Sequence, residues 1–390
     1  MPKPIEPSTP APLNQRIAES ALAFRGYNVT NLGRTPELLA VAPYAAIVRD
    51  ELNRFSAICA EIIHVPVDLA RNVAERREYG LDQYAHAVAL VVAVETAQLR
   101  LLRDVHGIDY QHARLAFGYS LGEVTAVSCG GAIAVEHLIR VPLELARDCA
   151  ELAHDTRLAV LFSRGKAIPE SHVHRLCVKV TSAGQGAIGV SAVLSPNSYL
   201  LVGQGDTMAR FKAALSDEFP AGAHLRLNDH RWPPLHTPIV RQRHIPDRTS
   251  VMLESMAFNP FPVRPSVVSL VSGKRNYDES TARELLRDWV DKPQRLWDAV
   301  CETLAADVKT VLHIGPEPNV VPATFTRLAE NVRQQTDGHS LSSYSRRAMT
   351  GMARHPWLGT ILPARATLLR APFITQINLE DWLLENIPRG

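Results

Sequence analysis

The stretch Leu115-Ala-Phe-Gly-Tyr-Ser-Leu-Gly-Glu-Val124 decides the fold expected for this chain. Its apolar start is typical of a buried strand, and the residues from Glu123 onward are typical of a helix. Between them, Gly118-x-Ser120-x-Gly122 has the spacing of a nucleophile elbow, in which the glycines allow a turn that presents the serine hydroxyl at the end of the strand. The free N–H groups at the helix N-terminus lie where an oxyanion would be stabilised. Ser120 is therefore a candidate nucleophile, and the alternative is a glycine-flanked packing turn.

The composition excludes several classes of protein. With 46% hydrophobic residues, 21% charged residues and a net charge of +2, the chain is expected to be a soluble globular protein without nucleic acid or a membrane as its partner. The N-terminus is proline-rich and lacks the apolar core of a signal peptide. The five cysteines are scattered and show no CxxC spacing, which predicts buried thiols in a reducing cytoplasm and no metal site.

Strands that alternate with helices predict an α/β fold with a parallel sheet. Its strands are expected at 21–24, 115–117, 266–271 and 310–314. A second pattern, strand-helix-strand-strand-helix-strand, begins near Thr156 and is that of a ferredoxin-like unit. We therefore predict four parts: a disordered arm (1–15), an α/β-hydrolase-like large domain (16–155 and 231–330), a ferredoxin-like small subdomain (156–230), and a linker with a C-terminal extension (331–390).

Several motifs, in order, resemble those of the acyl-CoA:acyl-carrier-protein acyltransferase family, which includes malonyl-CoA:ACP transacylases and the acyltransferase domains of polyketide synthases. The resemblance covers about residues 20 to 330 and rests on the following segments: Gly118-Tyr-Ser-Leu-Gly-Glu-Val-Thr-Ala126 (GHSLGExxA in the family), Phe24-Arg-Gly-Tyr27 (FPGQG), Leu235-His-Thr-Pro-Ile-Val240, Trp289-Val-Asp-Lys-Pro-Gln-Arg-Leu-Trp297 (WxxxPVxW/F) and His313-Ile-Gly-Pro-Glu-Pro318.

The resemblance implies roles for individual residues. His236 would be the base that activates Ser120, and the backbone N–H groups of Leu121 and Tyr27 would form the oxyanion hole. Gln83 falls where the family has a glutamine that opens a helix, and we assign it to substrate binding. A lone glutamine at a helix start is equally consistent with a cap or a solvated residue. For His236 the alternative is a surface or core histidine, since the chain has 15 histidines.

The sequence departs from the family pattern at positions that would face the substrate. Tyr27 replaces the glutamine of FPGQG, Tyr119 replaces the histidine before the nucleophile, and Leu194 replaces an asparagine of the small subdomain. Malonyl-using members carry an arginine that pairs with the substrate carboxylate. Counting from Ser120 without a gap places Leu145 at the position of this arginine. Arg147 follows two residues later, which is about 200° further around a helix. Arg147 is therefore either a carboxylate clamp after a register shift or a solvated surface residue.

The expectation is a cytoplasmic serine acyltransferase that needs no cofactor. It would move an acyl group from acyl-CoA to the phosphopantetheine thiol of an acyl carrier protein. Malonyl is the family default, whereas the four altered positions favour an uncharged acyl group. Two alternatives stay open: an acyl hydrolase or thioesterase on the same fold, and a catalytically weakened scaffold or docking subunit.

Overall fold

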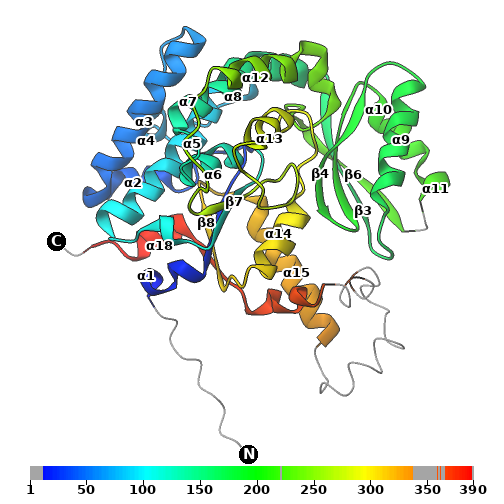
Figure 1. The fold of residues 1–390 in the computed structure, drawn as a ribbon. Helices are drawn as coiled ribbons and strands as arrows, with labels where there is room; N and C mark the ends of the chain where they lie inside the picture. Colours follow the sequence, from blue (N-terminus) through cyan, green and yellow to red (C-terminus); the bar gives the residue numbers. More distant parts are fainter. Residues whose placement is uncertain (1–11, 220–221, 337–357, 359–360, 362–364, 389–390) are drawn as a thin grey trace, which may run out of the picture.

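The main sheet of the computed structural model is parallel and has five strands in the order β7-β2-β1-β8-β9. The structure describes residues 12–219, 222–336, 358, 361 and 365–388. The strands are β1 Ser20–Phe24, β2 Leu115–Gly118, β7 Ser266–Val268, β8 Thr310–Ile314 and β9 Thr375–Asn378. Every residue of β1, β2 and β8 is buried, as expected for a parallel sheet with both faces covered (Figure 1).

The two faces of the main sheet belong to two different cores. Leu22 and Phe24 of β1 join a core with the long helices of the chain, whereas Ala21 and Ala23 join a second core with α14, α15 and the small subdomain. The α-helices outside the small subdomain are α1 Leu13–Arg16, α2 Thr35–Ala40, α3 Ala42–Ile63, α4 Leu69–Ala74, α5 Tyr84–Arg100, α6 Gly122–Cys129, α7 Val135–Leu138, α8 Arg140–Ala153, α12 Ile245–Glu254, α13 Ala282–Asp288, α14 Leu296–Ala305, α15 Val320–Thr336 and α18 Leu379–Glu385. Short 3-10 segments are η1 Ile17–Glu19, η2 Leu81–Gln83, η4 Tyr110–His112, η5 Pro238–Arg243 and η6 Ala366–Phe373, and η3 Leu101–Val105 is a π-helix.

Helix α5 is the centre of the first core. Nearly all of its side chains are buried, and it packs against α3 and α8. Of the described residues, one helical stretch, Leu81–Val105, is long and apolar enough to cross a membrane, but 78% of its most apolar window is buried inside the molecule. Its hydrophobicity therefore has a structural use as a core helix.

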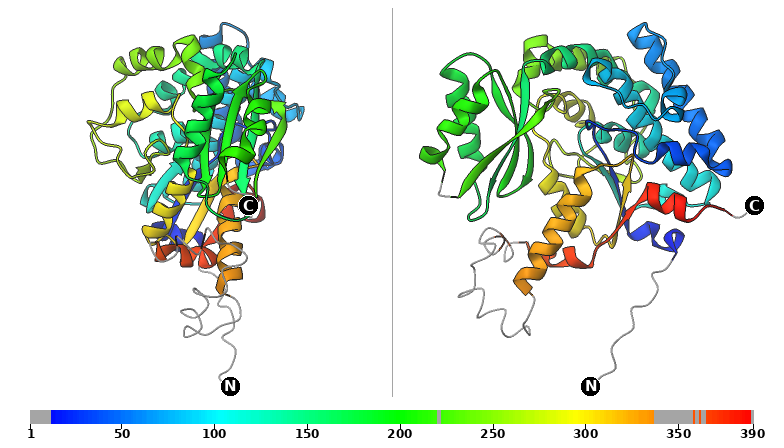
Figure 2. Two further views of the ribbon diagram at one scale, coloured as in Figure 1. Left: turned by 90° about the vertical axis from the view of Figure 1, so that its right-hand side faces the viewer. Right: turned by 180° about the vertical axis from the view of Figure 1, so that it is seen from behind.

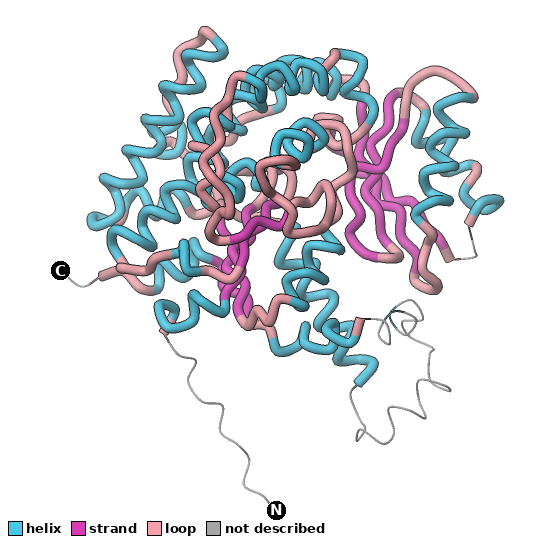
Figure 3. Tube along the Cα trace, viewed as in Figure 1, coloured by secondary structure: helices cyan, strands magenta, loops and turns pink. Residues whose placement is uncertain are grey.

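The small subdomain is an antiparallel sheet with helices on one face. Its elements are β3 Thr156–Ser163, α9 Glu170–Ser182, β4 Ile188–Ser195, β5 Ser198–Gln204, α10 Thr207–Ala213, α11 Leu215–Glu218 and β6 Ala223–Arg231. The strand order β4-β5-β3-β6 is that of a ferredoxin-like unit. Figure 3 shows the two sheets as separate groups of strands, and Figure 2, from behind, shows the small subdomain and helices α2 to α4 on opposite sides of the main sheet. The predicted fold class is confirmed.

The structure corrects two of the predicted boundaries. The expected C-terminal extension contains β9, which pairs with β8 in the main sheet, and α18, whose Leu379 and Leu383 are buried in the first core. Helix α15 also continues to Thr336, beyond the predicted start of the linker. At the other end, α1 begins at Leu13, which is buried, so the predicted arm is packed from there onward. The rest of the arm (1–11) and most of the predicted linker (337–357) lie outside the described residues.

Candidate active site

The candidate nucleophile lies in a sharp turn between β2 and α6. Ser120 has a φ of 54°, in the left-handed region that non-glycine residues rarely adopt. A side chain at Gly118 would collide with the backbone of Gly122, and a side chain at Gly122 would collide with the backbone at the end of β1. The two glycines therefore allow the close contacts that hold Ser120 in this conformation, at the carboxyl end of the main sheet.

His236 is positioned to accept the proton of Ser120. Its Nε2 lies 2.7 Å from Ser120 Oγ, and its Nδ1 lies 2.7 Å from the carbonyl oxygen of Trp289. Because a carbonyl can only accept, Nδ1 carries the hydrogen and Nε2 is left as the acceptor that faces the serine. Burial lowers the pKa of His236 to about 4, while the hydrogen bond to Trp289 acts in the opposite direction. The histidine is therefore neutral, as a general base must be, throughout the physiological pH range.

Two residues of the Trp289–Trp297 motif, Trp289 and Gln294, hold this arrangement in place. Trp289 accepts from His236 through its carbonyl, and its indole Nε1 donates to the carbonyl of Ser120 at 2.9 Å. Gln294 accepts the backbone N–H of Ser120 at 3.0 Å through its side-chain oxygen. The backbone of Gln294 also bonds to Ser191 and Val193 of β4, which ties the small subdomain to the nucleophile turn. In the sequence, their position within the Trp289–Trp297 motif was the only indication that these two residues belong to the site.

Two backbone N–H groups near Ser120 are the candidate oxyanion donors. Leu121 precedes the first turn of α6, and Tyr27 follows Gly26 in the loop after β1. Gly26 is packed so closely that a β-carbon on it would lie 3.0 Å from the Ser120 β-carbon. Among the described residues, neither N–H has a hydrogen-bond acceptor. Donors that are fixed and unpaired in the resting protein are what an oxyanion hole requires.

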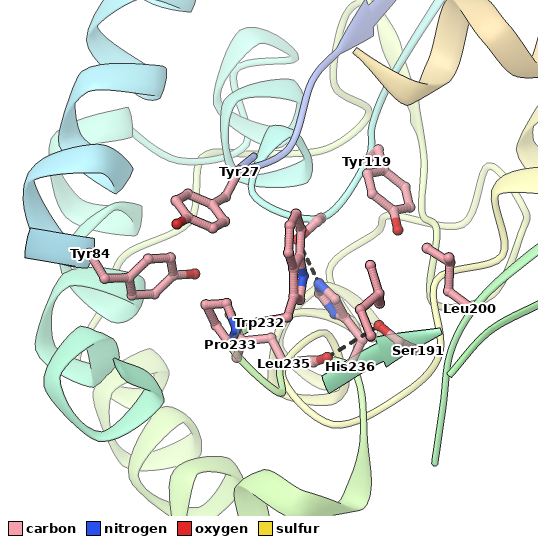
Figure 4. A pocket seen from close by; sticks show the side chains of 11 residues that line it. Tyr27, Tyr84, Tyr119, Ser191, Leu200, Trp232, Pro233, Leu235 and His236 are labelled. Carbon is pink, nitrogen blue, oxygen red and sulfur yellow. Dashed lines mark hydrogen bonds between the residues drawn. The ribbon is translucent and has the colours of Figure 1, made fainter. Parts of the chain in front are cut away.

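A small cavity of about 40 Å³ opens beside Ser120 and His236. Figure 4 shows Tyr27, Tyr84 and Pro233 on one side of it and Tyr119 and Leu200 on the other. The full lining is Tyr27, Tyr84, Tyr119, Ser120, Leu158, Ser191, Leu200, Trp232, Pro233, Leu235 and His236, and none of these is a lysine, arginine, aspartate or glutamate. The rings of Tyr27 and Tyr84 meet edge to face at 4.8 Å, and Trp232 lies 5.6 Å from Tyr27. The cavity is small and aromatic, and no charged side chain lines it.

Tyr119 and Tyr27 therefore line the cavity. The other three predicted substrate-binding residues, Gln83, Leu194 and Arg147, lie elsewhere. Gln83 is exposed at the end of η2, and its neighbour Tyr84 takes the place at the cavity. Leu194 packs against the second hydrophobic core, near the end of β4. The structure brings neither of them to the cavity.

Arg147 lies on the outer surface of α8. Its side chain is 89% exposed and pairs with Glu151 one helical turn further along, at 3.0 Å. Leu145, two residues earlier, is buried. Leu145 therefore faces inward, as the count without a gap predicts. Arg147, about 200° further around the helix, faces solvent. Over the described ranges, no cluster of three or more His, Cys, Asp or Glu residues is arranged to hold a metal ion.

Comparison with known proteins places this geometry in a known fold. No protein-family model matches the sequence, and no curated protein does. Solved structures do match. A malonyl-CoA:acyl carrier protein transacylase from Xanthomonas oryzae pv. oryzae is 17% identical, with 79% of this chain and 90% of that chain covered and a TM-score of 0.62. The acyltransferase domain from module 8 of the salinomycin polyketide synthase is 18% identical (79% and 67% covered, TM-score 0.63).

A third match comes from a complex of a type II polyketide synthase acyl-carrier protein with its malonyl-transacylase. It is 22% identical, covers 78% of this chain and 91% of that chain, and has a TM-score of 0.60. At these identities the likeness concerns the three-dimensional fold. The resemblance predicted from the sequence motifs is thus confirmed at that level: the chain has the fold of the malonyl-CoA:acyl carrier protein transacylases and polyketide-synthase acyltransferase domains.

Proposed function

We propose that this protein is a serine acyltransferase that moves a short, uncharged acyl group from coenzyme A to the phosphopantetheine thiol of an acyl carrier protein. The observation that carries the proposal is the 2.7 Å contact between Ser120 Oγ and His236 Nε2 at the mouth of a cavity without charged side chains. Fold alone would not support it, because one fold hosts many activities.

In the first half-reaction, Ser120 Oγ attacks the thioester carbonyl of acyl-CoA while His236 Nε2 takes the hydroxyl proton. The oxyanion that forms is bound by the N–H groups of Leu121 and Tyr27. The C–S bond then breaks, and the coenzyme A sulfur leaves with the proton that His236 carries. The acyl group stays on Ser120 as an ester.

In the second half-reaction the carrier protein thiol replaces coenzyme A. His236 takes the thiol proton, the sulfur attacks the ester carbonyl, and the same two N–H groups bind the oxyanion. Ser120 leaves and receives the proton back from His236. The carbonyl of Trp289 accepts from Nδ1 throughout, in the place where a catalytic triad has a carboxylate, so that the imidazolium is stabilised by a backbone dipole.

The lining of the cavity supports an uncharged substrate. A malonyl group would bring its free carboxylate among tyrosine, leucine and tryptophan side chains, with no lysine or arginine in the lining to pair with it. Burying an unpaired carboxylate is strongly unfavourable. A volume of about 40 Å³ also suits an acetyl-sized group better than a long chain.

Support for the carrier protein is structural likeness, since one of the matched structures is a transacylase in complex with an acyl-carrier protein. We propose a soluble, cytoplasmic enzyme that needs no metal or other cofactor. Neither nucleic acid nor a membrane is part of the proposed reaction.

The test is a two-step transfer. The protein is acylated with acetyl-CoA, freed of the CoA, and then mixed with a holo acyl carrier protein or with buffer alone, and both proteins are weighed by intact mass spectrometry. The proposal expects the acyl mass to leave Ser120 and to appear on the carrier protein, while the buffer control keeps its acyl group. Ser120→Ala is the control for the site of attachment.

Two other results would each favour one alternative. Loss of the acyl group at the same rate in buffer alone would make the protein a hydrolase. Absence of any acyl-enzyme, from any acyl-CoA, would make it a scaffold with an inactive site.

A further inference from the structure

Arg25 is an unusual residue in the loop that carries the proposed second oxyanion donor. Its side chain is completely buried, although arginine is rarely buried without partners. The guanidinium donates to the Gly26 carbonyl at 2.7 Å, to Asn31 Oδ1 at 2.8 Å, to the Thr30 carbonyl at 3.3 Å and to the Pro316 carbonyl. The family motif that this loop resembles has a proline at this position. A proline cannot make these hydrogen bonds, so they distinguish this sequence from the motif.

The bond to Gly26 acts on a specific peptide group. The Gly26 carbonyl and the Tyr27 N–H belong to the same planar peptide unit and point in opposite directions. A donor fixed on the carbonyl side therefore sets the direction of the N–H on the other side. That unit lies against the nucleophile, because a β-carbon on Gly26 would be 3.0 Å from the β-carbon of Ser120.

The guanidinium is itself held by elements from distant parts of the chain. Pro316 follows β8, and the next residue, Glu317, donates its backbone N–H to Glu380 on α18 at 3.1 Å. The other oxygen of Glu380 accepts from the backbone of Arg34 at 3.1 Å, so this buried side chain ties the loop after β1 to the loop after β8. Glu95 of α5 accepts the backbone N–H of Arg25 at 3.0 Å.

We propose that Arg25 is a positioning residue of the acyl-transfer reaction. Its guanidinium orients and polarises the Gly26–Tyr27 peptide so that the Tyr27 N–H binds the oxyanion formed at Ser120. The C-terminal helix α18 takes part in this through Glu380. The inference rests on the proposed function, in which Ser120 is acylated.

The charge of Arg25 persists in this buried site. Burial lowers its pKa to about 10, and Glu95, Glu380, Glu317 and Glu78 act in the opposite direction. At neutral pH the side chain remains a cation, and a charge-assisted hydrogen bond is stronger than one from a neutral donor. Polarising the peptide from its carbonyl end makes the N–H a better donor.

The test compares Arg25→Leu and Arg25→Lys with the wild type. The readout is the rate constant for acylation of Ser120 at saturating acetyl-CoA, followed by intact mass, together with the concentration for half-maximal rate. A misdirected oxyanion donor costs about 10- to 100-fold in the rate constant and little in substrate binding. The half-maximal concentration is expected to change less than the rate constant. Arg25→Lys keeps the charge but loses the planar fork, and is expected to lie between the wild type and Arg25→Leu.

Leu52→Ala is the matched control for lost stability. Leu52 is completely buried in α3, which packs against α5 and lies outside the site. All variants are measured at a temperature where each is folded by circular dichroism. Slow acylation in the Arg25 variants with normal acylation in Leu52→Ala supports the proposal. Equal rates in all of them, or equal losses in Leu52→Ala, would overturn it.

Two further measurements keep the proposal testable in every case. If Arg25→Leu does not fold, Arg25→Lys and Glu380→Gln carry the comparison, and Glu380→Gln is expected to slow acylation less than either Arg25 variant. If no acyl-CoA acylates the wild type, the proposed function fails. The reaction of Ser120 with a small fluorophosphonate, which also builds charge on an oxygen in the oxyanion hole, then replaces acylation in the same comparison. A wild-type serine that resists the fluorophosphonate would contradict both proposals.

Discussion

The two sides of the cavity beside Ser120 are built in different ways. The catalytic side comprises Ser120, His236, Trp289 and Gln294. Most of its hydrogen bonds involve a backbone group: the Trp289 carbonyl accepts a hydrogen bond from His236, and the Gln294 side chain accepts one from the N–H of Ser120. On the acyl side, side chains form the wall, and they come from the loop after β1, the turn after β2, helix α5, the small subdomain and the loop before His236. This acyl side comprises Tyr27, Tyr84, Tyr119, Leu158, Leu200 and Trp232.

The geometry of the catalytic residues is therefore fixed independently of the side chains that contact the acyl group. Backbone contacts hold the serine and the histidine in one geometry whatever acyl group arrives. Side chains on the other wall can change without disturbing that geometry, and in this sequence they form an uncharged, aromatic surface. The following predictions test that separation, beginning with the largest effect.

Removal of either catalytic side chain should abolish the reaction. We expect Ser120→Ala and His236→Ala to lower the acylation rate by about 10⁴-fold or more, with no acyl adduct on the serine variant. Both are measured by intact mass after incubation with acetyl-CoA. The exposed Ser216 of α11 offers a control, since Ser216→Ala should react like the wild type. Acylation of Ser120→Ala at a normal rate would place the nucleophile elsewhere.

Loss of the Gln294 side-chain oxygen should weaken catalysis without changing the substrate preference. In Gln294→Leu the half-buried N–H of Ser120 loses its acceptor, and the strained nucleophile turn loses a contact that holds it. We expect the acylation rate to fall by about 10- to 100-fold, and unfolding in urea to show a loss of about 1–3 kcal/mol. The ratio of rates for acetyl-CoA and malonyl-CoA should stay constant. A changed ratio would contradict the separation of the two sides.

A cation placed on the acyl side should change the preference. Leu200 lies in the wall and is half-buried, so an arginine there can reach the cavity while its stem packs against apolar neighbours. We expect Leu200→Arg to raise the ratio of malonyl-CoA to acetyl-CoA acylation by about 10-fold, through a charge-assisted pair with the malonyl carboxylate. Leu200→Met controls for the altered shape. An unchanged ratio in Leu200→Arg would show that charge in this wall does not set the preference.

Stability should fall as the pH rises from 7 to 8. Burial raises the pKa of Glu95 and of Glu380 to about 8, so both are protonated in the folded protein where the unfolded chain has lost those protons. The folded state therefore binds more protons, and its stability decreases with rising pH up to about 8. His236 and His313, whose pKa values burial lowers to about 4, are neutral in both states over most of this range.

The expected loss is about 2 kcal/mol, measured by urea unfolding at the two pH values. Glu380→Gln removes one of the two titrating groups and should reduce the change by about half. A stability that does not fall between pH 7 and 8 would show that these carboxyls are ionised in the folded protein.

The smallest effect is expected for Arg147→Ala. Because Arg147 is 89% exposed and its ion pair is with Glu151 on the same helix surface, its loss should change acylation by malonyl-CoA and by acetyl-CoA less than about twofold, and stability by less than about 1 kcal/mol. Steady-state kinetics with both substrates provide the measurement. A selective loss of malonyl activity would restore Arg147 as the carboxylate clamp.

The features that were predicted from the sequence are those set by local patterns. The nucleophile turn follows from two glycines and a serine, and the small subdomain follows from the order of its strands and helices. Strand β9 was missed because Thr375–Asn378 is short and its partner β8 lies more than sixty residues away in the chain.

The parts of the site that were not predicted depend on the backbone and on helix register. Nothing in a tryptophan predicts that its carbonyl will orient a histidine, since every residue has a carbonyl. Arg147 and Leu145 differ only by rotation around α8, and Gln83 and Tyr84 differ by a single position. Such distinctions require the three-dimensional packing.

The acyl preference of Ser120 can be measured by intact mass after brief incubation with acetyl-, butyryl- and malonyl-CoA in parallel, with Ser120→Ala as the control. We expect an adduct from acetyl-CoA that is absent from Ser120→Ala, and an adduct from malonyl-CoA that forms far more slowly. Faster acylation by malonyl-CoA would contradict the assignment of an uncharged acyl group, and no adduct from any of the three would contradict the assignment of Ser120 as a nucleophile.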